Sequence, residues 1–227
     1  MTVQIPPDHL NKTKIFHITA IDNLESILKS SFIYSTNHLK CQHHSIASED
    51  VQGKRAAKQV AIYPFGVLHD YVPFYFAPRS PMLCSNYKEN IPNACPQEEI
   101  VHLVTSAQIV AEAKLPFVFY DRHAIKAVAQ PYNDLKSLDK IDWELFFELP
   151  ILGGYSKIWN DRYDPKKPKH INRMEVRMAE FLVYQQLEWK FIKVIATMTK
   201  EKAEQVEKIM QSHGQQTRVI VKPEWYY

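Results

Sequence analysis

The sequence predicts an α+β fold, and three features of the chain support this prediction. Apolar residues make up 45% of the 227 residues, enough to fill a substantial core, so we expect a single domain over residues 1–227. Short apolar and aromatic runs at residues 71–77, 100–106 and 116–121 are typical of buried strands. The end of the chain predicts a strand (191–198), a helix (200–212) and a strand (217–223) in succession, which suits a mixed α+β domain.

The first third of the chain predicts a strand, a helix and then a long polar segment. Residues 15–19 (IFHIT) are typical of a short strand, and Asp22 is expected to cap a helix whose apolar face begins at Leu24. Residues 37–68 are polar and weakly periodic, and they are too many for an ordinary connection between elements. This segment is therefore either a functional loop or partly helical.

A second loop is expected before the last part of the chain. Gly, Pro and Lys are concentrated at residues 151–170, and residues 172–187 then return to apolar sequence that suits either a helix or a strand. The loop therefore leads directly into a structured element.

Composition excludes several classes of protein. The balance of 28 Lys and Arg against 25 Asp and Glu gives a net charge of only +3, which does not indicate the concentrated basic field of most nucleic-acid binders. Three cysteines without CxxC spacing predict neither a disulfide framework nor a metal site, and they suit a reducing, cytoplasmic compartment. No signal core or membrane-spanning stretch is expected. Five glycines without a Gly-rich loop argue against the Rossmann and P-loop modes of nucleotide binding.

Two residues near the start of the chain could contact a nucleotide, although position alone favours ordinary roles for both. His17 lies among apolar neighbours in the first expected strand, which favours a hydrogen-bonded core histidine. Arg55 lies in the basic cluster GKRAAK, and such clusters usually form a solvated face. The alternative for Arg55 is recognition of a phosphate or a base edge by its fork of donors.

The segment HDYVPFYFAPRSPM (69–82) combines aromatic residues with two proline-bounded turns. A core strand followed by a turn accounts for its aromatic residues, but not for Arg79 to Met82, which we expect to form a rigid polar loop with an exposed arginine. Aromatic and basic residues together can stack bases and contact phosphates of single-stranded nucleic acid. This pattern has modest specificity.

Glu180 stands between basic residues and the apolar run FLVY (181–184). Position favours an ordinary strand-edge carboxylate, and the alternative is a cleft carboxylate that stabilises a developing oxocarbenium ion or handles a proton. Glu175 and Glu188 are competing candidates for such a role.

Taken together, five blocks of sequence resemble the DarT family of ADP-ribosyltransferases over residues 14–227. The blocks are IFHITAIDNLESIL, QGKRAAKQV with GVLHDYVPFYFAPRSPML, EEIVHLVTSAQIV with PFVFYDRHA, AEFLVY, and the terminal WYY. The resemblance implies an ADP-ribosyltransferase fold, in which two packed β-sheets form a cleft for NAD⁺ with helices outside. It also implies an enzyme that transfers ADP-ribose from NAD⁺ to a base in single-stranded DNA and needs no metal.

The resemblance further implies roles for individual residues. Arg55 and Glu180 correspond to the catalytic pair, with Glu180 near the nicotinamide ribose and Arg55 binding pyrophosphate, orienting the base or assisting its deprotonation. The implied cofactor-binding residues are His17, Ile18, Thr19, Asn23, Arg55, Tyr71 and Tyr75. The implied DNA-binding residues are Arg79, Ser80, Met82, His123, Lys169 and Arg177. Lys166 and Lys167 are additional candidates for phosphate contacts.

Family members pair with a macrodomain antitoxin, DarG, which the resemblance implies as a partner. The HDYVPFYF block is more similar to the thymidine-modifying members than to those that modify guanosine. Two alternatives stay open: an ADP-ribosyltransferase that acts on RNA or protein, and a non-catalytic nucleic-acid-binding relative. A two-metal nuclease is less compatible, because the sequence lacks a clustered Asp, Glu and His set.

Overall fold

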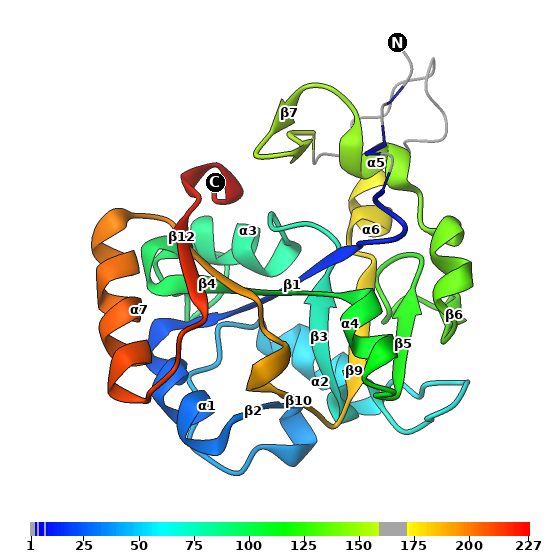
Figure 1. The fold of residues 1–227 in the computed structure, drawn as a ribbon. Coiled ribbons are helices and arrows are strands. Elements are labelled where there is room, and N and C mark those ends of the chain that lie inside the picture. Colours follow the sequence, from blue (N-terminus) through cyan, green and yellow to red (C-terminus); the bar gives the residue numbers. More distant parts are fainter. Residues whose placement is uncertain (1–2, 4, 7, 159–171) are drawn as a thin grey trace.

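A computed structural model describes residues 3, 5–6, 8–158 and 172–227 of the chain (Figure 1). Its main feature is an eight-stranded sheet with the order β12-β11-β4-β1-β3-β9-β5-β6. In that order, the strands are β12 (Arg218–Val221), β11 (Val194–Thr197), β4 (Ile100–Ser106), β1 (Lys14–Ala20), β3 (Tyr71–Tyr75), β9 (Glu180–Tyr184), β5 (Phe117–Tyr120) and β6 (Pro131–Tyr132). Neighbouring strands are antiparallel except for β11 and β12, which are parallel and joined by a helix.

The large sheet consists of two four-stranded halves that meet between β1 and β3. All seven residues of β1 pair with β4, and all five residues of β3 pair with β9, but β1 and β3 share only the pair Phe16 and Tyr75. Next to this pair, Pro73 has no N–H to offer a neighbouring strand. Its carbonyl oxygen instead accepts a hydrogen bond from His17 Nδ1 at 2.8 Å. The two sheets implied by the resemblance are thus two halves of one ladder.

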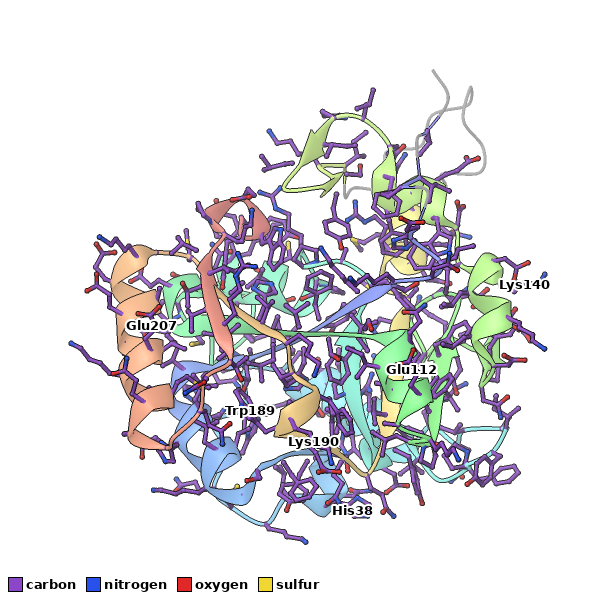
Figure 2. All side chains as sticks on the ribbon, in the orientation of Figure 1. His38, Glu112, Lys140, Trp189, Lys190 and Glu207 are labelled. Atoms are coloured by element: carbon purple, nitrogen blue, oxygen red, sulfur yellow. The ribbon has the colours of Figure 1, made fainter. Side chains whose placement is uncertain are left out.

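Two short two-stranded sheets and a set of helices surround this sheet (Figure 1). The short pairs join β2 (Phe32–Tyr34) to β10 (Gln186–Glu188) and β7 (Ile151–Leu152) to β8 (Tyr155–Ser156). The α-helices are α1 (Leu24–Ser30), α2 (Glu49–Ala57), α3 (Pro81–Tyr87), α4 (Ala107–Glu112), α5 (Trp143–Phe147), α6 (Arg173–Arg177) and α7 (Lys200–Ser212). Figure 2 shows Glu207 on α7 and Lys140 beyond β6 on opposite sides of the molecule.

Several expected elements are confirmed by the structure, and the α+β class is confirmed with them. The strand at 100–106 and the helix at 200–212 have the expected bounds. The helix begins where it does because Thr199 caps it, accepting a hydrogen bond from Lys202 N. The segment 37–68 is partly helical, since it contains α2. The strand expected at 191–198 begins only at Val194, because a 3₁₀ turn occupies residues 189–191.

One expected helix cap is wrong. Asp22 lies inside a 3₁₀ turn (Ile21–Asn23), so α1 begins at Leu24 and its N-cap position is occupied by Asn23. The Asn23 side chain does not cap the helix either, because its amide is used in contacts with β1 and a distant loop. The 3₁₀ turn therefore moves the start of the helix beyond the residue whose side chain suggested it.

The central strands bury both of their faces, so alternate residues belong to two different cores. Phe119 and Phe181 pack in the larger core, whereas Val118 and Leu182 pack in a smaller one on the other face. Each is fully buried, and burial of such a side chain is worth about 1.5–3 kcal/mol. Among the described residues, no helix is long and apolar enough to cross a membrane.

Candidate active site

The two predicted catalytic residues are in direct contact inside the protein. Arg55 Nη1 donates a hydrogen bond to Glu180 Oε2 at 2.7 Å, although 125 positions separate them in sequence. Both side chains are almost fully buried, with 10% of Arg55 and 3% of Glu180 exposed. The other carboxylate oxygen, Oε1, accepts from Ala124 N at 3.2 Å. Two donors therefore hold a buried carboxylate in a fixed orientation.

Three separate elements position this pair. Glu180 is the first residue of β9, and Arg55 lies in the last turn of α2. The loop that supplies Ala124 is attached to α6 because Arg122 and Lys126 both pair with Glu175, at 3.6 and 3.1 Å. Because a central strand, a helix and a braced loop contribute to the pair, its geometry depends on the tertiary fold.

Tyrosines flank Glu180 on both neighbouring strands. Tyr75 on β3 and Tyr120 on β5 are its direct partners in the register of the sheet. Burial, and then the negative charge of Glu180, raises the pKa of Tyr75 above its ordinary range and raises the pKa of Tyr120 to about 12. Both phenols therefore stay protonated at neutral pH and can donate hydrogen bonds.

Two histidines near the pair are kept neutral. Burial lowers the pKa of His123, with Glu180 opposing and Arg55 adding to the shift. Burial and the charge of Arg55 also lower the pKa of His69, whose Nε2 donates to Gln52 Oε1 at 2.8 Å. Both residues are thus neutral hydrogen-bonding groups close to Arg55 and Glu180.

Within the described residues, one nitrogen of this site has no hydrogen-bond partner. Arg55 Nη2 is buried and unpaired, although buried guanidinium donors are normally satisfied. An unpaired donor beside a fixed carboxylate is suited to an oxygen of a bound ligand, such as a phosphate, a ribose hydroxyl or a base carbonyl.

A cavity of about 340 Å³ lies along the seam between β1 and β3, and neither Arg55 nor Glu180 is among its lining residues. His17, Ile18 and Pro73 line it on the sheet side, and Gln52 and His69 line it near α2. The remaining lining residues are Ser26, Ile27, Phe32, Ile33, Tyr34, Thr36, Leu39, Cys41, His43, Ser45, Ile46, Ala47 and Met82. The cavity is mostly apolar with a few polar groups, which is typical of a small-molecule site.

His17 is neutral at this cavity, because burial lowers its pKa to about 4 while the bond to Pro73 opposes the shift. Its Nδ1 carries the hydrogen, since the Pro73 oxygen can only accept. Nε2 therefore has a lone pair and can accept a hydrogen bond from a ligand.

The two polar residues expected to hold the nucleotide with His17 are engaged within the protein. Asn23 Nδ2 donates to Thr19 Oγ1 and to His44 O, both at 2.9 Å, and Asn23 Oδ1 accepts from His44 N at 2.8 Å. Thr19 and Asn23 are buried. They attach the loop at His44 to β1 and so shape the cavity wall. Tyr71 is likewise buried, and its hydroxyl donates to Phe65 O at 2.5 Å.

The expectation that Arg79 is exposed is wrong. Its Nη2 donates to Tyr226 O at 2.5 Å, and its guanidinium lies 5.2 Å from the centre of the Tyr227 ring. Burial lowers the pKa of Arg79. Arg79 is thus partly buried, and Ser80 is buried, with its hydroxyl accepting from Leu83 N and capping α3. The polar loop expected here is thus anchored by the last residues of the chain and a helix start.

The remaining DNA-binding candidates differ in their settings. Met82 is partly buried and lines the cavity, and His123 lies beside the catalytic pair. Arg177 is buried on α6, where Nη1 donates to Ser156 O at 3.0 Å and to Ile158 O at 2.6 Å. Lys169, together with Lys166 and Lys167, lies outside the described residues.

Sequence reasoning missed three residues of the site. Gln52, one helical turn before Arg55, and His69 link α2 to the segment before β3. Tyr120 is the partner of Glu180 on β5. Gln52 shares a helix face with Arg55 by its i, i+3 spacing, so that spacing was the available signal. Among the described residues, no group of three or more His, Cys, Asp or Glu side chains is arranged to hold a metal ion.

This arrangement is suited to breaking a glycosidic bond. A fixed carboxylate can stabilise the positive charge that develops on a ribose when its base departs, and the protonated tyrosines and the unpaired arginine donor can orient the sugar and phosphates. The mostly apolar cavity that Gln52 and His69 line has a volume within the range of small-molecule sites.

Comparison with known proteins leads to the same chemistry. The family model described as "ssDNA thymidine ADP-ribosyltransferase, DarT" matches residues 16–227. A DNA ADP-ribosyl transferase of Thermus sp. (strain 2.9) is 40% identical over 217 residues, covering 95% of this chain and 96% of the relative. The structure of Thermus sp. 2.9 DarT in complex with ADP-ribosylated single-stranded DNA has a TM-score of 0.86 and 36% identity over 100% of both chains. The complex of Thermus sp. 2.9 DarT with NAD⁺ matches over the same share, with a TM-score of 0.80 and 36% identity.

The family model spans nearly the whole chain, and the relative from Thermus sp. is 40% identical over 95% of it. The ADP-ribosyltransferase fold expected from the sequence is confirmed by the same structures. The chain belongs to the DarT family of DNA ADP-ribosyltransferases.

Proposed function

We propose that this enzyme transfers ADP-ribose from NAD⁺ to a thymidine base of single-stranded DNA, with Glu180 and Arg55 as its catalytic residues. The observation that carries the assignment of residues is the buried 2.7 Å contact between them, with Arg55 on the same helix as Gln52, which lines the cavity. The choice of thymidine rests on the description of the family model and on the HDYVPFYF segment.

In the proposed reaction, the bond between nicotinamide and C1′ of the ribose breaks, and nicotinamide leaves with the bonding electron pair. Positive charge builds up on the ribose, and Glu180 stabilises it at close range. A ring nitrogen of the base then attacks C1′ and loses its proton, so the products are modified DNA, nicotinamide and H⁺. Arginine rarely gives up its own proton, so we assign Arg55 to holding Glu180 and binding a substrate oxygen through Nη2.

The cavity at the seam is the proposed NAD⁺ site. His17 Nε2 can accept a hydrogen bond from the ligand, and Tyr75 can donate one near Glu180. Ile18 contributes to the cavity wall, while Thr19 and Asn23 support it through the loop at His44. Tyr71 has the same kind of supporting role, because its hydroxyl is bonded to Phe65 O.

The DNA is proposed to approach from the side of Met82 and His123. Met82 lines the open cavity, and His123 is a neutral group beside Glu180. Arg79, Ser80 and Arg177 would act on DNA through the segments that they hold, since each is engaged with protein atoms.

The decisive experiment uses NAD⁺ labelled in its adenylate part. The purified enzyme is incubated with single-stranded oligonucleotides in which one base type at a time is removed, with duplex DNA, RNA and protein alongside. We expect label only on single strands that contain thymidine. Label on RNA or protein, or on oligonucleotides without thymidine, would contradict the proposed acceptor.

The matched variants are Glu180→Gln and Glu188→Gln. Glu180→Gln keeps the size and an acceptor oxygen but removes the charge, so transfer should fall roughly 100-fold or more. Glu188 lies on β10, outside the site, and its carboxylate is 2.6 Å from Lys190 Nζ. Its variant should therefore retain activity. Equal activity of the two variants would refute the role of Glu180.

We also propose a macrodomain antitoxin of the DarG type as the partner that counters this activity. Family membership is the support for this proposal. Expression of the enzyme should arrest growth of a bacterial host, and co-expression of such a macrodomain should restore it and remove label from DNA. Growth arrest that persists with Glu180→Gln would show that the toxicity has another source.

A further inference from the structure

The segment between α2 and β3 presents two aromatic rings to solvent. Tyr63 is 61% exposed and Phe65 is 55% exposed, and they are the most exposed aromatic side chains of the described residues. Their ring centres are 6.4 Å apart at an angle of 89°, so each ring keeps a face that its neighbour does not cover. Large exposed aromatic pairs of this kind often mark a binding surface.

The backbone holds these rings firmly. The base of the segment is closed by a bridge between Gln59 and Val67 and by the bond from Val60 N to Gly66 O at 2.9 Å. The tip is held from outside, because Asn133 Nδ2 donates to Tyr63 O at 3.1 Å and Tyr71 donates to Phe65 O. The backbone that carries the two rings is therefore ordered before a ligand binds.

Phe65 adopts a conformation that a phenylalanine normally avoids. Its φ is +63°, in the left-handed region, and Phe65 N donates to Ile62 O at 2.8 Å in a tight turn. Strained residues of this kind persist where the surroundings enforce them, and they gather at functional sites. The apolar ring of Phe65 is thus exposed to water on a strained backbone, although such a side chain is ordinarily buried.

The segment lies on the same face of the sheet as the catalytic carboxylate. Val60 and Leu68 from its base pack in the smaller core with Ala124, whose N–H binds Glu180, and with Tyr120, the register partner of Glu180. In Figure 1 the segment, in cyan, loops out beside β5. A polymer that places one base at Glu180 has to run past neighbouring surface of this face.

The segment has no charged side chain of its own that would repel an anionic ligand. Residues 59–67 (QVAIYPFGV) carry no charged side chain. Lys58 stands at their base, where Nζ contacts Lys126 O at 3.5 Å. Lys126 follows two residues after Ala124, its Nζ pairs with Glu175 at 3.1 Å, and Asp70 Oδ2 accepts from Val67 N at the base of the segment, so the charges around the base are balanced.

From these observations we infer that Tyr63 and Phe65 form a stacking platform for bases of the single-stranded DNA that flank the acceptor base. Any base can stack on an aromatic face. The platform should therefore make affinity for DNA increase with strand length without adding a sequence preference. The inference rests on the proposed DNA substrate, and it adds a second contact region beyond the catalytic cleft.

The test compares oligonucleotides with one acceptor thymidine and 2, 4, 8 or 12 flanking nucleotides on each side. The variant Tyr63→Ser/Phe65→Asn removes both rings, and asparagine tolerates the left-handed conformation. We expect its KM for the longer strands to rise roughly tenfold, as loss of one stacked base predicts. The KM for the shortest strand, the KM for NAD⁺ and kcat should stay unchanged.

Two further variants distinguish base stacking from simple apolar contact. Tyr63→Trp keeps a ring face and should retain wild-type KM values, whereas Tyr63→Leu keeps apolar area without a ring face and should not. Val221→Ala, at the β12 edge on the opposite end of the sheet, removes an exposed apolar residue elsewhere and should change nothing.

The outcomes distinguish this inference from the proposed function. If the wild-type enzyme does not label single-stranded DNA, the proposed function fails. If it does, and the double variant shows the same KM for all lengths as the wild type, only the platform is refuted. A double variant that modifies DNA normally but no longer binds an antitoxin or another protein would also refute the platform, because the rings would then serve a protein contact.

Discussion

Replacement of Glu180 by alanine leaves the guanidinium of Arg55 buried beside an empty position. The structure allows the cost to be worked out, because both side chains are nearly inaccessible and their contact is 2.7 Å long. Breaking a buried pair by removing one partner typically costs about 3–5 kcal/mol, whereas removing both partners costs far less. Ala124 N also loses its acceptor, which adds roughly 1 kcal/mol.

We therefore expect Glu180→Ala to lower the free energy of unfolding by about 4 kcal/mol, the low end of the general range for a broken buried pair together with the lost acceptor of Ala124 N. Arg55→Met should cost a similar amount, since it leaves the carboxylate uncompensated. The double variant should cost less than the sum of the two single variants, by about 2 kcal/mol.

The assay is urea denaturation at pH 7, followed by tryptophan fluorescence, for the wild type, the two single variants and the double variant. Glu180→Gln is the control, because it retains an acceptor for Ala124 N and should be less destabilising than Glu180→Ala. Costs that add within about 0.5 kcal/mol would show that the two groups do not interact energetically. A more stable Glu180→Ala protein would show instead that the site stores strain for catalysis.

Three more predictions concern the frame of the site. His102 is fully buried and its pKa is lowered by burial to about 4. In the unfolded chain His102 takes up a proton near pH 6.5, whereas in the folded protein it does so only near pH 4. The free energy of unfolding should therefore fall as the pH drops from 6.5 to 4. In acid-unfolding curves, His102→Gln should reduce that fall by about 2 kcal/mol at pH 5. Gly153→Ala should destabilise by at least about 1 kcal/mol in urea, because a Cβ there would lie 2.8 Å from Trp225 Cδ1, whereas Gly154→Ala, with no atom within 4 Å, should cost less. Ser80→Ala should cost about 1 kcal/mol in thermal unfolding through loss of the α3 cap, and an unchanged Tm would contradict that role.

Much of the fold could be predicted because local sequence and tertiary burial agree there. Residues 100–106 are apolar throughout most of their length, and the strand they form is buried on both faces. The helix at 200–212 has both its cap and its apolar stripe in the local sequence. Asp22 failed as a cap because the 3₁₀ turn that displaces it has no comparable signal.

The site was predictable only through resemblance to a family. Arg55 looks like one member of an ordinary basic cluster, and its burial depends on a carboxylate 125 positions away. The hydrogen-bond partner of Arg79 lies 147 positions away, near the end of the chain, so nothing near Arg79 in sequence indicates that it is held by protein atoms. Long-range pairing of this kind has no local sequence pattern.

The seam between β1 and β3 has a consequence for how the molecule opens. Backbone ladders are continuous within each half of the sheet, but only one register pair crosses from one half to the other. Cooperative opening units usually follow continuous ladders, so amide hydrogen exchange should divide the strand amides into two groups with different protection. A ligand that fills the cavity along the seam contacts both groups, so its binding should slow exchange in the two halves together.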